Sequence, residues 1–297
     1  MPYSRVERQN LFKGLAFLSP WIIGFTAFTL LPILLSLYYS FCDYNLLQPP
    51  IVRGLENYRD LASDTVFWQS LRVTATFALW ALPLGMILAL TFSLLLNVKI
   101  RGQSIYRTII FLPSLVPAVA LAMIWLWLYN PKLGLINQGL RHLGVAQPPG
   151  WLSDPNWSLR ALILMSLWGC GNTVIIYLAG LQDVPRDLYE AADLDGAGMF
   201  AKVWHVTLPS ISPVIFFNLI MGIIGTIQQF TLPYIMTPSG QPGRATYFFT
   251  MYLTDNAFVY LKMGLGSAMA WIQLLIILAL TAIAFGTSRR WVYYQGK

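Results

Sequence analysis

Charged side chains are scarce in this sequence. Asp, Glu, Lys and Arg make up 10% of its 297 residues, and the mean hydropathy is +0.59. Water-soluble domains contain about a quarter charged residues, so this composition excludes an ordinary soluble fold. We expect an integral membrane protein, and the 11 Trp and 15 Tyr residues suit the boundary between lipid and water.

Cysteine and histidine are also rare, and neither type clusters. The chain has two of each: Cys42, Cys170, His142 and His205. A disulfide framework or a metal site needs closer or more numerous ligands. We therefore expect no metal, no catalytic residue and no cofactor bound by this chain. The net charge of +7 is scattered near the ends of apolar runs, so we expect no nucleic-acid binding.

Long apolar runs dominate what remains. Six runs reach the roughly 20 residues that an α-helix needs to cross a bilayer, at about 15–41, 71–96, 108–129, 159–182, 209–230 and 265–287. The first follows a basic stretch but is too long for a secretory signal, so we interpret it as a retained helix. The predicted fold is an all-α integral membrane protein with one transmembrane domain (15–288), an N-terminal segment (1–14) and a tail (289–297).

Proline inside these runs predicts kinks or broken helices, because each proline removes a backbone donor. Five prolines lie inside the runs: Pro20, Pro32, Pro83, Pro113 and Pro117. The segments between runs on the outer side, about 42–70, 130–158 and 231–264, are polar and could hold short interfacial helices.

Lys and Arg near the helix ends set the expected orientation. With six spans, both termini share one side, which carries Arg5, Arg8, Lys13, Lys99, Arg101, Arg107, Arg186, Lys202, Arg289, Arg290 and Lys297. The other side carries Arg53, Arg59, Arg72, Lys132, Arg141, Arg160, Arg244 and Lys262 over a greater length. The bias places both termini in the cytoplasm.

The sequence contains no G-x-x-x-x-G-K-[ST] phosphate-binding loop and no charged residue within the six apolar cores. ATP must then be hydrolysed by another chain if ATP drives the protein. Ion-driven carriers usually keep ionisable residues inside the membrane, so their absence disfavours that class. An ion-coupled secondary carrier of a small polar solute remains the alternative, because backbone carbonyls can bind sodium.

The loop 184–208 has the local signals of a helical hairpin. Pro185 suits the first turn of a helix, Glu190 lies near its positive end, and Gly196 is expected to end it in a left-handed cap that a side chain would obstruct. A second short helix is expected to align Phe200, Val203, Trp204 and Thr207 on one stripe. These signals fit equally an interfacial hairpin that only joins two spans.

The residue pattern of this loop resembles a known family. Glu190-Ala-Ala, Gly196 and Val206-Thr-Leu-Pro209 resemble the EAA loop of binding-protein-dependent ABC importer permeases, with Val206 where that family has Ile. Further segments are similar to the carbohydrate branch of these permeases, which includes the maltose and glycerol-3-phosphate types: Ser19-Pro20-Trp21, Tyr38–Phe41, Glu56-Asn57-Tyr58, Tyr106-Arg107-Thr108, Phe111–Ser114, Gly134–Asn137, Leu178–Gln182 and Arg289–Tyr294.

The resemblance implies a multi-pass protein of the cytoplasmic (inner) membrane of a prokaryote, and it implies a complex. Its expected members are two homologous permease subunits, most often a heterodimer, two ATPase subunits that use ATP and Mg, and an extracytoplasmic solute-binding protein that delivers a sugar. The EAA loop would dock into a cleft on the ATPase. The expected coupling residues are Glu190, Ala191, Ala192, Asp195, Gly196, Ala197, Met199 and Phe200.

Amides, hydroxyls and aromatic rings inside the predicted spans are candidate sugar contacts. Asn218, Gly222, Thr226 and Gln229 recur at helical spacing in the fifth span. The fourth span offers Trp168 and Asn172 near Cys170, and the sixth offers Trp271 and Gln273. Polar and small residues in membranes also serve simply to pack helix against helix, which is the competing interpretation for each of them.

Overall fold

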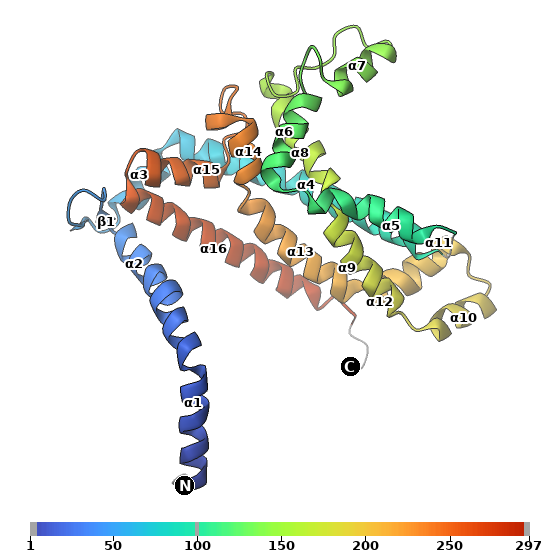
Figure 1. Cartoon of the computed structure of the whole chain (residues 1–297), viewed down its shortest axis with the longest axis horizontal. Coiled ribbons are helices and arrows are strands. Elements are labelled where there is room, and N and C mark those ends of the chain that lie inside the picture. Colours follow the sequence, from blue (N-terminus) through green and yellow to red (C-terminus); the bar gives the residue numbers. More distant parts are fainter. Residues whose placement is uncertain (1–4, 99–100, 294–297) are drawn as a thin grey trace. The chain divides into compact units, whose positions relative to one another are not determined.

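The computed structural model describes residues 5–98 and 101–293. Residues 1–4 of the predicted N-terminal segment, residues 294–297 of the predicted tail, and Lys99 lie outside the described residues. The described chain is mostly helical (Figure 1). It divides into two compact units: one ends at Asp64 and also includes Leu253–Ile272, and the other comprises Thr65–Tyr252 and the chain from Gln273.

The first unit starts with a long apolar helix. Its helical elements are α1 (Arg5–Phe25), a π-helical turn η1 (Thr26–Leu30), α2 (Leu31–Ser40), α3 (Glu56–Ser63), a second π-helical turn η5 (Asp255–Val259) and the start of α16 (Met263–Ser288). Strand β1 (Cys42–Asp43) pairs antiparallel with β2 (Ile51–Val52). Pro20 and Pro32 do not break the stretch Phe12–Ser40, which is apolar enough to cross a membrane and has no buried residue in its most apolar window.

Side chains of α3 form hydrogen bonds to the end of α2. The Asn57 amide donates to the carbonyls of Ser40 and Cys42, at 2.9 Å each. The Tyr58 hydroxyl donates to Ser40 Oγ at 2.9 Å. Gly264, at the start of α16, passes so close to the Cys42 carbonyl that no larger residue has room there.

The second unit is built around α4 (Thr65–Asn97). Its other helices are α5 (Gln103–Phe111), α6 (Ala118–Leu128), α7 (Leu135–His142), α8 (Pro155–Trp168), α9 (Gly171–Gln182), α10 (Arg186–Leu194), α11 (Met199–Lys202), α12 (Leu208–Ser210), α13 (Ser212–Ile227), α14 (Thr231–Met236) and α15 (Phe249–Thr254), together with 3₁₀ turns η2 (Leu112–Leu115) and η4 (Pro238–Gly240) and the π-helical turn η3 (Val203–Thr207). Helix α4 packs against α8, α9 and α13.

A buried aromatic cluster closes one end of this unit. Phe77 meets Phe248 edge to face at 5.1 Å between ring centroids. The Tyr129 hydroxyl donates to the Ala161 carbonyl at 2.8 Å, and the Trp151 indole donates to Asn137 Oδ1 at 2.7 Å. Short helices α7, α14 and α15 occupy the segments where interfacial helices were expected.

The spans differ in part from the prediction. Among the residues that the structure describes, four helices are long and apolar enough to cross a membrane: Phe12–Ser40, Thr65–Asn97, Ser212–Met236 and Met263–Ser288. The predicted span 108–129 is instead a bent pair, Gln103–Leu115 and Ala118–Leu128, turned by 98° where Pro117 follows an extended Val116. The predicted span 159–182 is bent by 45° between α8 and α9, at Gly169 and Cys170. The count reaches six only if each bent pair is one span.

Candidate functional site

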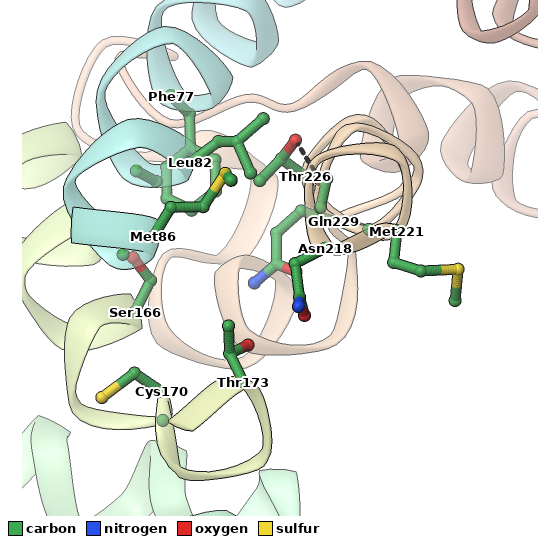
Figure 2. Close-up of a pocket in the computed structure, with 15 residues that line it drawn as sticks. Phe77, Leu82, Met86, Ser166, Cys170, Thr173, Asn218, Met221, Thr226 and Gln229 are labelled. Carbon is green, nitrogen blue, oxygen red and sulfur yellow. Dashed lines mark hydrogen bonds between the residues drawn. The ribbon is translucent and has the colours of Figure 1, made fainter. Parts of the chain in front are cut away.

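A cavity of about 380 Å³ lies in the second unit, among α4, the α8–α9 junction and α13 (Figure 2). Helix α4 contributes Phe77, Ala81, Leu82, Gly85 and Met86; α8, α9 and their junction contribute Ser166, Gly169, Cys170 and Thr173; α13 and the residues after it contribute Asn218, Met221, Gly222, Gly225, Thr226 and Gln229. The bend between α8 and α9 places Gly169 and Cys170 in its wall.

Small residues bring α4 and α13 together along one side of the cavity. Leu82 of α4 occupies the space beside Gly222 where a Cβ would stand, so its side chain fits into the surface of α13. Gly85, one turn after Ala81, adds no side chain to the α4 wall. The two helices approach closely at Gly222. Gly85 and Gly225 have no side chains, and this leaves the space beside that contact open.

The polar groups in the cavity are uncharged. Three of them donate a hydrogen bond to a backbone carbonyl of their own helix: Ser166 Oγ to Ile163 O at 2.6 Å, Asn218 Nδ2 to Val214 O at 2.9 Å, and Thr226 Oγ1 to Gly222 O at 2.7 Å. Within the described chain, Asn218 Oδ1 and the whole Gln229 amide have no hydrogen-bond partner. Figure 2 shows both side chains extending into the space between the helices, on the side of Thr173.

This chemistry suits an uncharged polar ligand. Amide and hydroxyl groups can donate to and accept from the hydroxyls of such a molecule. A charged ligand would lack a counter-charge, because no Asp, Glu, Lys or Arg lines the cavity.

The structure brings together four of the eight predicted path residues. Asn218, Gly222, Thr226 and Gln229 line the cavity as one face of α13 and its C-terminal end. Whether they touch a substrate stays a prediction.

The other four predicted path residues lie elsewhere. Trp168 packs edge to face on Trp125, at 5.7 Å between centroids, and Asn172 is exposed outside the cavity. Trp271 belongs to the first unit, where its indole donates to Ser36 Oγ at 3.2 Å. Gln273 is only 8% exposed, and its amide donates to Ile227 O and to Thr250 Oγ1, each at 2.9 Å. Those bonds hold one helix against another, as the competing interpretation of helix packing expects.

The sequence reasoning missed the contribution of α4 and most of the α8–α9 wall. Ser166, Cys170 and Thr173 follow one another at helical spacing, and Ala81 and Gly85 are four residues apart. That spacing of small and hydroxyl residues was the available signal, and it resembles the stripe that identified α13.

The loop 184–208 forms a second candidate site, a pair of short helices, α10 and α11, joined by a tight turn. Gly196 has φ of +75°, and the amides of Gly196 and Ala197 donate back to Asp193 O (3.0 Å) and Ala192 O (2.9 Å). This is a Schellman cap, in which glycine is favoured because other residues are strained at positive φ. The expected obstruction by a side chain within the turn is wrong: no atom lies within 4 Å of a Cβ built on Gly196.

Contacts at the base of this pair attach it to the long helices. Leu181, Val184 and Ile211 are buried together, with Leu90, Leu94, Tyr189 and Ile215 packed against them. Tyr189 and Thr207 share a hydrogen bond of 3.0 Å between their hydroxyls, and Lys202 pairs with Asp193. The two short helices are therefore cross-linked to each other and seated on α4 and α13.

The tip of the pair is exposed and apolar. Exposed fractions reach 91% for Leu194, 90% for Phe200, 71% for Met199 and 69% for Trp204. The expected stripe of Phe200, Val203, Trp204 and Thr207 is wrong, because the π-helical turn η3 rotates Thr207 into the interior, where it is 3% exposed. Among the predicted coupling residues, Glu190, Ala191, Asp195, Gly196, Met199 and Phe200 are exposed, and Ala192 and Ala197 are partly exposed.

Comparison with known proteins gives consistent matches. Residues 81–293 match the family described as the binding-protein-dependent transport system inner membrane component. The chain is 40% identical to a probable ABC transporter permease of Bacillus subtilis over all of this chain and 97% of that protein. It is 32% identical to the trehalose/maltose transport system permease MalF of Thermococcus litoralis, over 96% of this chain and 97% of that protein.

A sulfoquinovosyl glycerol transport system permease of Agrobacterium fabrum is also 32% identical, over 90% of this chain and 87% of that protein. Among solved structures, the fold is similar to a chain of a bacterial alginate ABC transporter in complex with its alginate pentasaccharide-bound periplasmic protein. The TM-score is 0.82 and the identity 23%, over 95% of this chain and 96% of the other.

Proposed function

Because the chain belongs to the binding-protein-dependent family of inner-membrane transport components, we propose that it is the transmembrane subunit of an ATP-driven sugar importer. It forms half of the translocation path, together with a second, homologous permease chain in a heterodimer. Two ATPase subunits hydrolyse Mg-ATP in the cytoplasm, where both termini of this chain lie. A solute-binding protein delivers the sugar from outside.

The sugar class is supported by the cavity and by the relatives. The named relatives include trehalose/maltose and sulfoquinovosyl glycerol permeases, and sugars offer many hydroxyls and no net charge or a single anionic group. The cavity offers the free Asn218 Oδ1 and the Gln229 amide without a counter-charge. These groups are matched to a neutral sugar passing between α4 and α13.

The observation that carries the proposal is the exposed apolar tip of the α10–α11 pair. Leu194, Met199 and Phe200 are each at least 71% exposed, and exposed apolar side chains grouped on one surface mark an interaction site. A lipid-facing role is disfavoured, because the exposed carboxylate of Asp195 lies between Leu194 and Met199 in the sequence, and that of Glu190 lies one helical turn before Leu194. A mixture of apolar anchors and charged groups is typical of a protein interface, and a cleft on the ATPase is its proposed partner.

Co-purification of the ATPase tests this docking. We expect Phe200→Ala to reduce the ATPase recovered with the chain from mild detergent by at least about fivefold, since truncating a buried interface anchor commonly costs more than 1 kcal/mol. Leu143→Ala is the matched control, because Leu143 is 83% exposed and follows α7, far from the hairpin in sequence. Equal ATPase recovery from both variants and from the wild type would remove the docking role from the hairpin.

ATP depletion separates the importer from the ion-coupled carrier. Uptake of sugar into right-side-out vesicles should stop when internal ATP is removed, with the membrane potential held by an external ion gradient. Uptake that survives ATP removal and follows the ion gradient would support the carrier instead.

A further inference from the structure

A second cavity, of about 290 Å³, lies between α5, α9 and the end of α4, all within the second unit. Two of its lining residues have polar side chains: Arg107, in the middle of α5, and Gln182, the last residue of α9, four residues before α10 begins. The remaining lining is apolar.

Depth along α9 orders the lining from polar to apolar. Gln182 and Gly171 are eleven residues apart, which is about 16 Å along a helix. Between them lie Val174 and Leu178, which also line the cavity. At the far end, the start of α9 touches the end of α5: a Cβ on Gly171 would be 2.8 Å from Ile110 O, so the helices close the cavity there.

The guanidinium of Arg107 lacks an ionic partner within the described part of the chain. Its Nε is shielded from solvent and has no hydrogen-bond partner among the residues that the structure describes. None of the ion pairs in the described ranges, 5–98 and 101–293, involves Arg107. A shielded guanidinium donor without a partner is costly, and its planar fork of N–H groups fits a phosphate or carboxylate oxygen pair.

We propose that this cavity binds an anionic phospholipid, with the headgroup phosphate on Arg107 and the upper acyl chain along Val174 and Leu178. A shielded guanidinium donor in a lining whose only other polar side chain is Gln182 suits a lipid, which joins a phosphate to an apolar chain. Basic pockets between helices at the cytoplasmic surface bind such lipids elsewhere. Assigning the site to the cytoplasmic leaflet rests on the proposed function, because the lining residue Gln182 ends α9 and leads into the hairpin that is proposed to face the ATPase.

Lipid retention by the purified transporter tests the site without any transport step. The complex is purified from membranes or reconstituted with equal phosphatidylglycerol and phosphatidylcholine, and bound lipids are counted by native mass spectrometry. We expect the wild type to retain phosphatidylglycerol selectively and Arg107→Gln to retain about five- to tenfold less, as expected for the loss of one charged contact. Arg107→Lys should recover part of the binding.

Two further variants make the result specific. Arg101→Gln removes an exposed arginine at the same end of the unit and should leave retention unchanged. Ile175→Trp keeps Arg107 but fills the cavity from its partly exposed wall, and should also lose the lipid. It keeps the test decisive if Arg107→Gln does not fold.

The proposal is overturned if the wild type retains neither lipid, if it retains both equally, or if Arg107→Gln retains as much phosphatidylglycerol as Arg101→Gln. None of these outcomes depends on which solute is carried. Failure of the lipid site would therefore leave the importer proposal standing, and failure of ATP-dependent uptake would leave the lipid result standing.

Discussion

Replacing Gln273 and Gln229 by Leu, one at a time, distinguishes a structural amide from a ligand-facing one. Gln273 makes two hydrogen bonds, to Ile227 O and Thr250 Oγ1, at 2.9 Å each. Side-chain hydrogen bonds between membrane helices contribute about 0.6 kcal/mol on average and about 1.7 at most. Gln273→Leu should therefore lower stability by about 1–3 kcal/mol, and the melting temperature by several degrees.

Gln229 should behave in the opposite way. Its amide has no partner within the described chain and faces the cavity, so Gln229→Leu should change stability by no more than about 0.5 kcal/mol. Loss of one neutral hydrogen bond to the sugar should raise the half-saturating concentration for transport about three- to tenfold.

The assay pairs thermal unfolding of the purified transporter with sugar uptake by reconstituted vesicles. Gln273→Leu should lower the melting temperature and leave half-saturation near the wild-type value at temperatures where the protein stays folded. The reverse pattern, a stable Gln273→Leu with weakened sugar uptake, would refute the assignment of Gln273 to helix packing.

Substitutions at three further positions have defined outcomes. Gly264→Ala would press a Cβ into the Cys42 backbone carbonyl, so we expect a loss of at least about 2 kcal/mol in thermal unfolding; an unchanged melting temperature would contradict the close approach. Gly196→Ala should lower the free energy of unfolding by about 1–2 kcal/mol because of the positive φ alone, and Gly196→Asn should lower it less. The Gly196→Arg variant should stay in the membrane but lose transport and ATPase association. Normal transport by the Arg variant would contradict the docking model. Asp154→Ala removes the cap that accepts from Asn156 N at 2.9 Å and should destabilise by about 1 kcal/mol, while Asp154→Asn, measured in the same melting assay, should match the wild type.

Apolar run length predicted the long helices well. The predicted runs 71–96 and 265–287 fall inside α4 and α16, because a lipid-spanning helix needs little beyond continuous apolar residues. Run length failed at 108–129, where the helix turns by 98°. Pro113 and Pro117 predicted a break, but the angle depends on how α5 and α6 pack against their neighbours.

The cavity was predictable only along one helix. The α13 stripe was visible because helical spacing aligns Asn218, Thr226 and Gln229 on one face. Which helices face that stripe is a tertiary fact, so α4 was missed. Gln273 carries the same amide as Gln229, and only its contacts with Ile227 and Thr250 identify it as a packing residue.

The seat of the α10–α11 pair on α4 and α13 has a thermodynamic consequence. Leu90, which packs at that seat, is four residues from Met86, which lines the cavity between α4 and α13, a rise of about 6 Å. Ile215 of α13 packs at the same seat, and Asn218 three residues later faces the cavity. If the proposed ATPase displaces this seat when it binds and the displacement changes the cavity, reciprocity of coupled equilibria requires the converse. A ligand that prefers one shape of the cavity would then alter the affinity of the hairpin for the ATPase by the same factor.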